Sequence, residues 1–169
     1  MVNSYVTVLM GSDSDLPVVQ NTLDVLEKLA IPWQVKVTSA HRTPEDTRNF
    51  VENAENSGCA VFIAAAGLAA HLAGTVAALT TKPVIGIPIS GGALNGFDAL
   101  LSTVQMPGGV PVACVAIGNA GATNAGWLAA QILALNDPQL AEQLKNAKKS
   151  QADAVRAKDT LLQAKIAKD

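Results

Sequence analysis

Short apolar runs alternate with longer amphipathic segments along this chain of 169 residues. Continuous apolar runs of four to eight residues are typical of buried strands, and apolar residues spaced three or four apart are typical of helices. The pattern predicts strands at residues 5–10, 33–38, 60–66, 84–88 and 112–117. It predicts helices at residues 16–30, 44–56, 69–80, 98–103, 122–135 and 138–165.

This alternation predicts an α/β protein with a three-layer α/β/α, flavodoxin-like architecture. Strands that are joined by helices run parallel, and 2-1-3-4-5 is a common order for a five-stranded sheet of this kind. We expect one domain over residues 1–169, with an α/β core at 5–135 and a C-terminal helix at 138–165. Apolar residues are sparse in that last helix, so we expect it to lie at a subunit interface.

Charged residues are nearly absent from the middle of the chain. Between residues 57 and 136 the charged side chains are Lys82 and Asp98. Helices that face solvent normally carry charge. A surface rich in Ala, Thr, Asn and Gly would account for the shortage, but we favour burial of this region against other subunits.

Several classes of partner are not expected. The net charge is −2 and no long basic run is present, so we predict no nucleic-acid partner. The amino terminus has no signal-peptide pattern, so we predict a cytoplasmic location. Glycines and a histidine interrupt the apolar stretch at residues 59–79, so we predict no membrane partner. Cys59 and Cys114 are interpreted as buried thiols. No His or Cys pair has the usual spacing of metal ligands, so we expect no metal.

Polar residues gather immediately after the first three predicted strands. The three segments are Gly11-Ser12-Asp13-Ser14-Asp15, Ser39-Ala40-His41-Arg42 and Gly67-Leu68-Ala69-Ala70-His71. Open α/β sheets bind ligands beyond the carboxyl ends of the strands, at the point where the strand order reverses. We therefore expect a site in the crevice between the first and third strands.

The first two segments suit a sugar phosphate. Backbone N–H groups and hydroxyls at the start of the first helix can bind a phosphate monoester, although Ser14 or Asp15 could simply cap that helix. The Asp15 carboxylate would repel phosphate and is better suited to sugar hydroxyls. The planar fork of Arg42 can bind two phosphate oxygens, unless it pairs with the acidic residue at position 45 or 46.

His41 is the candidate for proton transfer. Imidazole titrates near neutral pH and can move a proton in either direction. A lone histidine is more often structural, but His41 directly follows a strand and sits between Ala40 and Arg42. His71 lies one turn into a predicted uncharged helix, where it could cap, bind substrate or pack.

Five motifs together resemble the class I PurE family. They are GSDSD at 11–15, SAHRTP at 39–44, AAGLAAHLAG at 65–74, QMPGGVPV at 105–112 and AIGNAGATNAGWLAAQIL at 116–133. They occur in the order and spacing usual for the family, and the resemblance covers about residues 5–135. The C-terminal helix carries little of it.

The resemblance implies an isomerase of purine biosynthesis that converts N5-carboxyaminoimidazole ribonucleotide (N5-CAIR) to 4-carboxyaminoimidazole ribonucleotide. The implied reaction loses carbon dioxide from the substrate and adds it back at ring carbon C4, without a metal or other cofactor. His41 matches the general acid/base of the family. The family assembles as a homo-octamer whose active sites are built at subunit interfaces.

Further matches with the family are implied residue by residue. Ser12, Ser14, Asp15 and Arg42 match the positions that hold the phosphoribosyl group. Ser39, Ala40, Gly67, Ala69, Ala70, His71 and Leu72 match the walls around the imidazole and its carboxylate. Two positions depart from the usual family pattern, with Ala73 in place of proline and Gly108 in place of arginine. We expect both of them in loops near the site.

Two other functions stay open. A second class of the same family carboxylates aminoimidazole ribonucleotide (AIR) directly with dissolved carbon dioxide, whereas the AAHL segment at 69–72 resembles the mutase class. A non-catalytic flavodoxin-like binding domain is the other alternative. A receiver domain that is phosphorylated on an aspartate needs that aspartate where Gly67 stands. A flavin-binding domain needs aromatic residues near the strand ends, where we do not expect Tyr5, Trp33 or Trp127.

Overall fold

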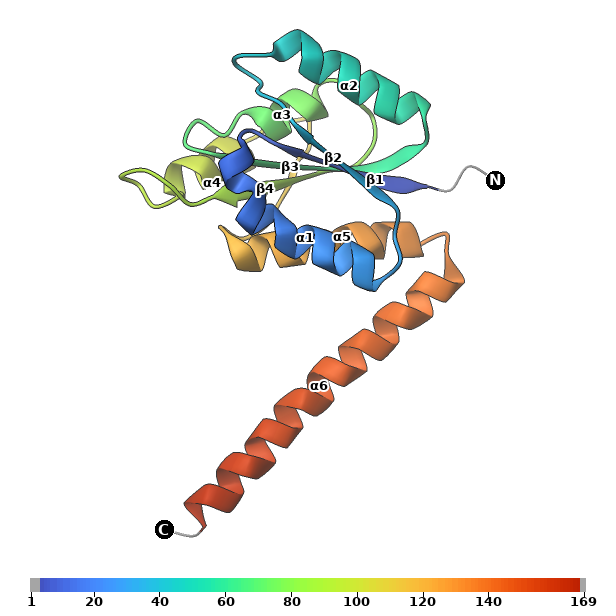
Figure 1. Ribbon diagram of the computed structural model, residues 1–169, viewed down its shortest axis with the longest axis vertical. Helices are drawn as coiled ribbons and strands as arrows, with labels where there is room; N and C mark the ends of the chain where they lie inside the picture. The colour runs from blue at the N-terminus through green and yellow to red at the C-terminus, as the bar shows by residue number, and fades with distance from the viewer. Residues whose placement is uncertain (1–3, 168–169) are drawn as a thin grey trace. The chain divides into compact units, whose positions relative to one another are not determined.

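The computed structural model describes residues 4–167 of the chain (Figure 1). Outside this range lie Met1–Asn3, which belong to the stretch where we expect no signal peptide, and the last two residues. The chain divides into two compact units, Met1–Leu133 and Ala134–Asp169. A single domain over residues 1–169 therefore stays a prediction.

A five-stranded parallel sheet forms the centre of the first unit. Its strands are β1 (Tyr5–Met10), β2 (Trp33–Val37), β3 (Cys59–Gly67), β4 (Val84–Ile89) and β5 (Ala113–Cys114). They are ordered β2-β1-β3-β4-β5, and every neighbouring pair is parallel. The predicted fold class and strand order are confirmed. The central strands β1, β3 and β4 are buried almost throughout, as is usual when helices cover both faces of a parallel sheet.

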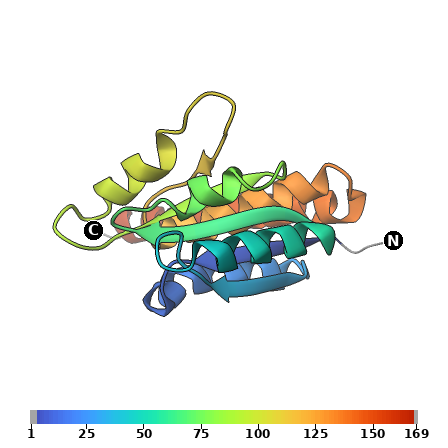
Figure 2. The same ribbon diagram turned by 90° about the horizontal axis from the view of Figure 1, so that it is seen from above.

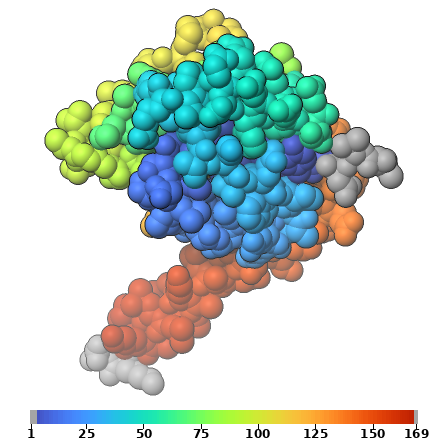
Figure 3. All heavy atoms as spheres, turned by 45° about the horizontal axis from the view of Figure 1, so that its top comes forward, coloured from blue at the N-terminus to red at the C-terminus, as the bar shows by residue number. Residues whose placement is uncertain are grey.

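Helices cover both faces of this sheet. They are η1 (Asp13–Asp15), α1 (Leu16–Lys28), α2 (Pro44–Asn56), α3 (Leu72–Ala77), α4 (Phe97–Val104) and α5 (Asn119–Ala134). Figure 1 shows α2 and α3 on one face and α1 and α5 on the other. In Figure 2, β2 and α4 lie at opposite edges of the sheet, as the strand order requires. Segment 33–37 reaches the molecular surface between α1 and α2 (Figure 3).

Different contacts hold the two helical layers. On the face of α2 and α3, Val51 and Val76 belong to one buried cluster with Phe62 of the sheet. On the other face, the Thr22 hydroxyl of α1 donates a hydrogen bond of 2.7 Å to the Ala122 carbonyl of α5. Gly126 lets these two helices approach closely, because a Cβ there would lie 2.8 Å from the Cβ of Val25.

The structure corrects two of the predicted elements. The helix expected at 69–80 is the six-residue α3, because tight turns between Leu68 and His71 delay its start; His71 precedes the helix instead of lying one turn inside it. The strand expected at 112–117 is the two-residue β5. Beyond Cys114 the chain turns into α5, helped by Gly118, whose φ is +74°.

The second unit contains α6 (Pro138–Ile166). The Asp137 side chain caps this helix by accepting hydrogen bonds from the N–H groups of Gln139 and Leu140, and proline occupies the first turn. Most of its side chains are exposed, including the apolar Val155 and Leu161. Among residues 4–167, no helix has both the length and the apolar composition needed to cross a membrane.

Gly86 of β4 provides a direct test of this packing. A Cβ at Gly86 would collide with the Thr103 methyl group of α4 and lie 3.2 Å from the Cβ of Ala73 in α3. We expect Gly86→Ala to lower the free energy of unfolding by about 1–3 kcal/mol through overpacking. Thr103→Ser removes the methyl group and keeps the hydroxyl that bonds to the Ala99 carbonyl, so it should recover part of the loss in the double variant.

Urea unfolding of the single and double variants measures this coupling. Gly108→Ala is the control, because a Cβ at Gly108 meets no atom within 4 Å; it should change the free energy by less than about 0.5 kcal/mol. Strictly additive losses in the Gly86→Ala/Thr103→Ser variant would contradict the predicted collision.

Candidate active site

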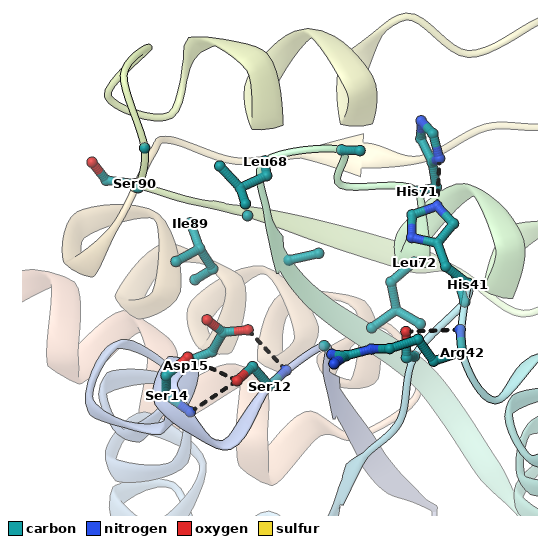
Figure 4. Close-up of a pocket in the computed structure, with 18 residues that line it drawn as sticks. Ser12, Ser14, Asp15, His41, Arg42, Leu68, His71, Leu72, Ile89 and Ser90 are labelled. Carbon is teal, nitrogen blue, oxygen red and sulfur yellow. Dashed lines mark hydrogen bonds between the residues drawn. The ribbon is translucent and has the colours of Figure 1, made fainter.

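A cavity of about 580 Å³ opens at the carboxyl ends of the parallel strands (Figure 4). Its lining comes from the last residues of β3 and β4 and from the segments that follow β1, β2, β3 and β4. Parallel strands place these four segments at one edge of the sheet, although they are far apart in sequence. The volume lies within the range that is usual for small-molecule sites.

The cavity brings together nearly all of the site residues expected from the sequence. Ser12, Ser14, Asp15, Ser39, Ala40, His41, Arg42, Gly67, Ala69, His71 and Leu72 all line it. Ala70 does not line it and is 1% exposed. Ala70 is covered because the turn that follows Leu68 directs its side chain into the protein.

Sequence reasoning missed one wall of the cavity. Ile89 ends β4, and Ser90, Gly91 and Gly92 follow it; all four line the cavity, together with Leu68 from the loop after β3. The glycine pair was visible in the sequence, and it follows a predicted strand like the other three segments. The rule that placed those three segments at one edge could therefore have found this wall as well.

The loop after β1 is held by its own polar groups. Ser12 caps η1 and accepts the Ser14 N–H, and the Ser12 N–H donates to Oδ2 of Asp15 at 3.2 Å. The Ser14 hydroxyl donates to the Ser12 hydroxyl at 2.8 Å. The capping alternative considered for Ser14 and Asp15 is wrong for α1: Asp15 stands at its N-cap position, but its side chain makes no capping hydrogen bond to that helix. The Asp15 carboxylate instead closes a reciprocal capping box with Ser12 at η1.

Asp15 is the buried carboxyl of the cavity. Its residue is 8% exposed. Burial raises the pKa of this carboxyl, the hydrogen bond from Ser12 lowers it, and the nearby charge of Asp13 raises it; the net direction is upward. A carboxylate in this environment would be stabilised by hydrogen bonds donated by the hydroxyl groups of a bound sugar.

The loop after β2 presents Arg42 to the cavity. The Ser39 N–H donates to the Thr43 hydroxyl at 3.0 Å, and the Arg42 N–H donates to the Ser39 hydroxyl at 3.2 Å. Within residues 4–167 the Arg42 guanidinium forms no ion pair, so the alternative pairing with position 45 or 46 is absent there. Figure 4 shows the Arg42 side chain extended toward the loop of Ser12.

The loop after β3 is tightly wound. Leu68 has a φ of +54°, a conformation that costs a non-glycine residue about 1–2 kcal/mol. The Ala70 N–H then donates to the Leu68 carbonyl at 2.9 Å, and the His71 N–H donates to the Ala69 carbonyl at 2.8 Å. These turns bring His71 to the rim of the cavity and leave the Leu68 side chain 56% exposed beside it.

The two histidines of the chain meet at this cavity. Nε2 of His41 lies 2.8 Å from Nδ1 of His71. The ring centroids are 4.9 Å apart and the ring planes are inclined at 80°, an edge-to-face arrangement. An imidazole placed beside Arg42 and small residues can exchange a proton with a bound ligand.

The two departures from the usual family pattern lie in different environments. Ala73 is the second residue of α3 and is 2% exposed, so the expectation that it lies in a loop is wrong. Gly108 lies in the segment between α4 and β5 and does not line the cavity. Neither substitution alters a side chain that faces the cavity.

Neither cysteine of the chain lines the cavity. In the described range 4–167, no three His, Cys, Asp or Glu side chains are grouped as a metal site would require. Cys59 is buried in β3, and burial raises the pKa of its thiol, which makes it a poor nucleophile. The side chains with a charge or a titratable ring that line the cavity are those of Asp15, His41, Arg42 and His71.

Known proteins share this sequence and fold. The chain is 55% identical over 139 residues to the N5-carboxyaminoimidazole ribonucleotide mutase of Bacillus subtilis (strain 168), a match that covers 82% of this chain and 86% of that protein. It is 50% identical over 150 residues to the protein of the same name from Escherichia coli (strain K12), and the match covers 89% of each. The solved structure of Treponema denticola PurE matches with a TM-score of 0.85 at 28% identity, over 93% of this chain and 97% of that one.

The resemblance found in the sequence motifs is confirmed by these matches. The family described as AIR carboxylase matches residues 5–154, which include every segment that lines the cavity. This chain belongs to the AIR carboxylase family.

Proposed function

We propose that this chain is an N5-carboxyaminoimidazole ribonucleotide mutase. The observation that carries the proposal is the convergence of His41, Arg42 and Asp15 on one cavity. That cavity lies in a chain 50–55% identical to proteins of this name. The enzyme moves a carboxylate from the exocyclic nitrogen N5 of the substrate to carbon C4 of its imidazole ring.

The phosphoribosyl group binds at the end of the cavity formed by the loops after β1 and β2. The Arg42 guanidinium and the hydroxyls of Ser12 and Ser14 supply donors to the phosphate, and the start of α1 adds a favourable dipole. Asp15 accepts hydrogen bonds from the ribose hydroxyls. In this arrangement the cation faces the phosphate and the buried carboxyl faces neutral groups.

The imidazole and its carboxylate bind at the end of the cavity nearer His41 and His71. Ala40, Gly67 and Ala69 line this part with small side chains, so backbone N–H groups can approach a carboxylate closely. Ser39 and Leu72 complete the wall. The reaction requires this compartment to be shielded from solvent, because carbon dioxide released in an open site would escape before it reacted again.

His41 serves as the general acid and base. In the first step the bond between N5 and the carboxylate breaks, carbon dioxide is released into the cavity, and the nitrogen takes a proton from His41. In the second step C4 forms a bond to the trapped carbon dioxide, and His41 removes the proton from C4. The two proton transfers cancel, so the enzyme returns to its starting state without a co-reactant.

Direct carboxylation of AIR is the second candidate function. The name of the family to which the chain belongs, AIR carboxylase, favours it. The names of the relatives at 50–55% identity favour the mutase. The non-catalytic alternative is disfavoured by the same relatives, and Tyr5, Trp33 and Trp127 do not line the cavity.

Self-association into a homo-octamer is part of the proposal. Leu94, Phe97, Leu101 and Val104 are exposed on α4 and the segment before it, within the part of the chain that has almost no charge. Phe97 is 63% exposed, and so large an exposed fraction is unusual for an aromatic side chain on the surface of a monomer. Exposed apolar residues on α6 support a second contact between subunits.

We also propose a cytoplasmic location for this protein. Both cysteines are free thiols, as is usual for proteins of a reducing compartment.

The substrate assay tests the proposed activity. We expect the purified protein to form 4-carboxyaminoimidazole ribonucleotide faster from N5-CAIR than from AIR plus bicarbonate, measured against the reaction without protein. We expect His41→Asn to lower kcat by about 10²–10⁴-fold, the usual contribution of a general acid/base, with ribonucleotide binding retained. Near-normal turnover by His41→Asn would exclude the proton-transfer role, and faster turnover of AIR plus bicarbonate would favour the carboxylase.

Asp15→Asn separates substrate binding from stability. The pKa of Asp15 is raised in the folded protein above its ordinary value of 3.8, so the stability that its protonated form contributes is present below that value and is lost as the pH rises through the folded pKa. Asparagine does not titrate and can still accept the Ser12 N–H. We therefore expect the Tm of Asp15→Asn, relative to the natural protein, to rise between acid and neutral pH, while ribonucleotide affinity falls.

Thermal unfolding across this pH range and ribonucleotide titration measure the two effects. Asp46→Asn is the matched control, because Asp46 is exposed on α2 and does not line the cavity; it should leave ribonucleotide affinity unchanged. A Tm difference independent of pH would contradict the raised pKa, and unchanged affinity in Asp15→Asn would contradict the contact with ribose.

The mass in solution tests the assembly. We expect light scattering at micromolar concentration to give the mass of eight chains of 17.4 kDa. Replacing both Phe97 and Leu101 with Ser should shift the mass toward smaller species, because these side chains would lose apolar area buried at the contact. The mass of a single chain for the natural protein would contradict the proposed octamer.

A further inference from the structure

We propose that His71 is a positioning residue for His41. In this arrangement Nδ1 of His71 accepts a hydrogen bond from the Nε2–H group of His41. The hydrogen bond holds the second nitrogen of His41, Nδ1, without a proton in the neutral ring. The inference deepens the proposed function and rests on the acid/base role of His41.

The geometry identifies the nitrogens that take part. The contact joins Nε2 of His41 and Nδ1 of His71 at 2.8 Å, a distance typical of a hydrogen bond between them. Figure 4 shows Nδ1 of His41 on the side of the ring that faces the cavity, whereas the other nitrogen of His71 points away from His41. His41 can therefore reach a ligand through Nδ1 while Nε2 stays bound to His71.

The proton in this contact can belong to either ring, and the two cases differ chemically. If His71 donates, Nε2 of His41 is the acceptor, and neutral His41 carries its proton on Nδ1. That form cannot take a proton from a ligand at Nδ1. If His41 donates from Nε2, its Nδ1 has a free lone pair and can accept a proton.

The arrangement in which His41 donates from Nε2 also suits both directions of a reversible proton transfer. When His41 gains a proton at Nδ1, its Nε2–H group continues to donate to His71. When it gives that proton up, the same hydrogen bond persists. One contact thus holds the ring in place through both protonation states, which makes His71 the acceptor throughout.

The surroundings of His71 leave its ring available for this role. His71 precedes α3, and its side chain makes no capping hydrogen bond to that helix. Within residues 4–167, neither histidine forms an ion pair with a carboxylate. The charged groups that share the cavity with the two rings are Arg42 and Asp15. Among residues 4–167, the hydrogen bond with His41 is therefore the polar contact of the His71 ring.

Solid-state NMR of protein with ¹⁵N-labelled histidine reads the tautomers directly, whatever the particle size. The chain contains two histidines, so the spectrum is simple, and His71→Asn leaves His41 as the only one. At about pH 9, where imidazole is neutral, we expect His41 to carry its proton on Nε2 in the natural protein. His71→Phe should add a measurable population with the proton on Nδ1.

Kinetics of two matched variants test the consequence. His71→Phe keeps a ring and removes the acceptor, and we expect kcat to fall about two- to tenfold, the effect of losing one hydrogen bond, with KM changed less than about twofold. His71→Asn supplies an amide oxygen as a replacement acceptor and should recover most of the lost kcat. Thermal unfolding of both variants checks that neither has lost its fold.

Each other result overturns the inference. A His41 ring with its proton on Nδ1 in the natural protein, or the same tautomer population in His71→Phe, removes the positioning role. A rise in KM at constant kcat assigns His71 to substrate binding instead, and equal losses in both variants show that hydrogen bonding is not what His71 supplies. If the natural protein does not rearrange N5-CAIR, the proposed function fails, and the NMR measurement still decides the tautomer of His41.

Discussion

The common direction of the five strands is the constraint on which the site depends. Each parallel strand ends at the same edge of the sheet, so the loops that follow four of them meet around one cavity. Asp15 and His41 are 26 residues apart along the chain and His41 and His71 are 30 apart, yet all three line the same cavity. The helices on both faces bury the central strands and keep these loops at fixed positions relative to one another. The chemistry is thus carried by connecting segments, and their positions are set by hydrogen bonds deep in the sheet.

Much of the fold follows from patterns that are local in the sequence. The apolar runs placed all five strands, and the Thr43-Pro44 pair placed the start of α2 at the correct residue, because proline suits the first turn of a helix. The strand order followed from general rules for parallel sheets. The site could be anticipated for the same reason, since residues just beyond strand ends must share one edge.

The rest depended on contacts that no local pattern encodes. The start of α3 is delayed by Leu68, which adopts a left-handed conformation that its residue type does not suggest. β5 has two residues because the chain must turn at Gly118 to begin α5. The contact between His41 and His71 joins two loops thirty residues apart and is set by the shapes of both. Sequence spacing alone placed these rings at one edge and left their mutual orientation open.

The hydrogen bond between Thr22 and Ala122 also bears on how the chain is made. Its partners are 100 residues apart, so a ribosome that has just released α1 has yet to synthesise the helix that packs beside it. The layer of α2 and α3 packs mainly on elements that end at β4, and Val112, which follows α4, joins the same cluster later. The nascent protein therefore has α1 alone on one face of its sheet until α5 is made. A partly covered apolar face is prone to aggregation, and this protein carries one until α5 has been synthesised.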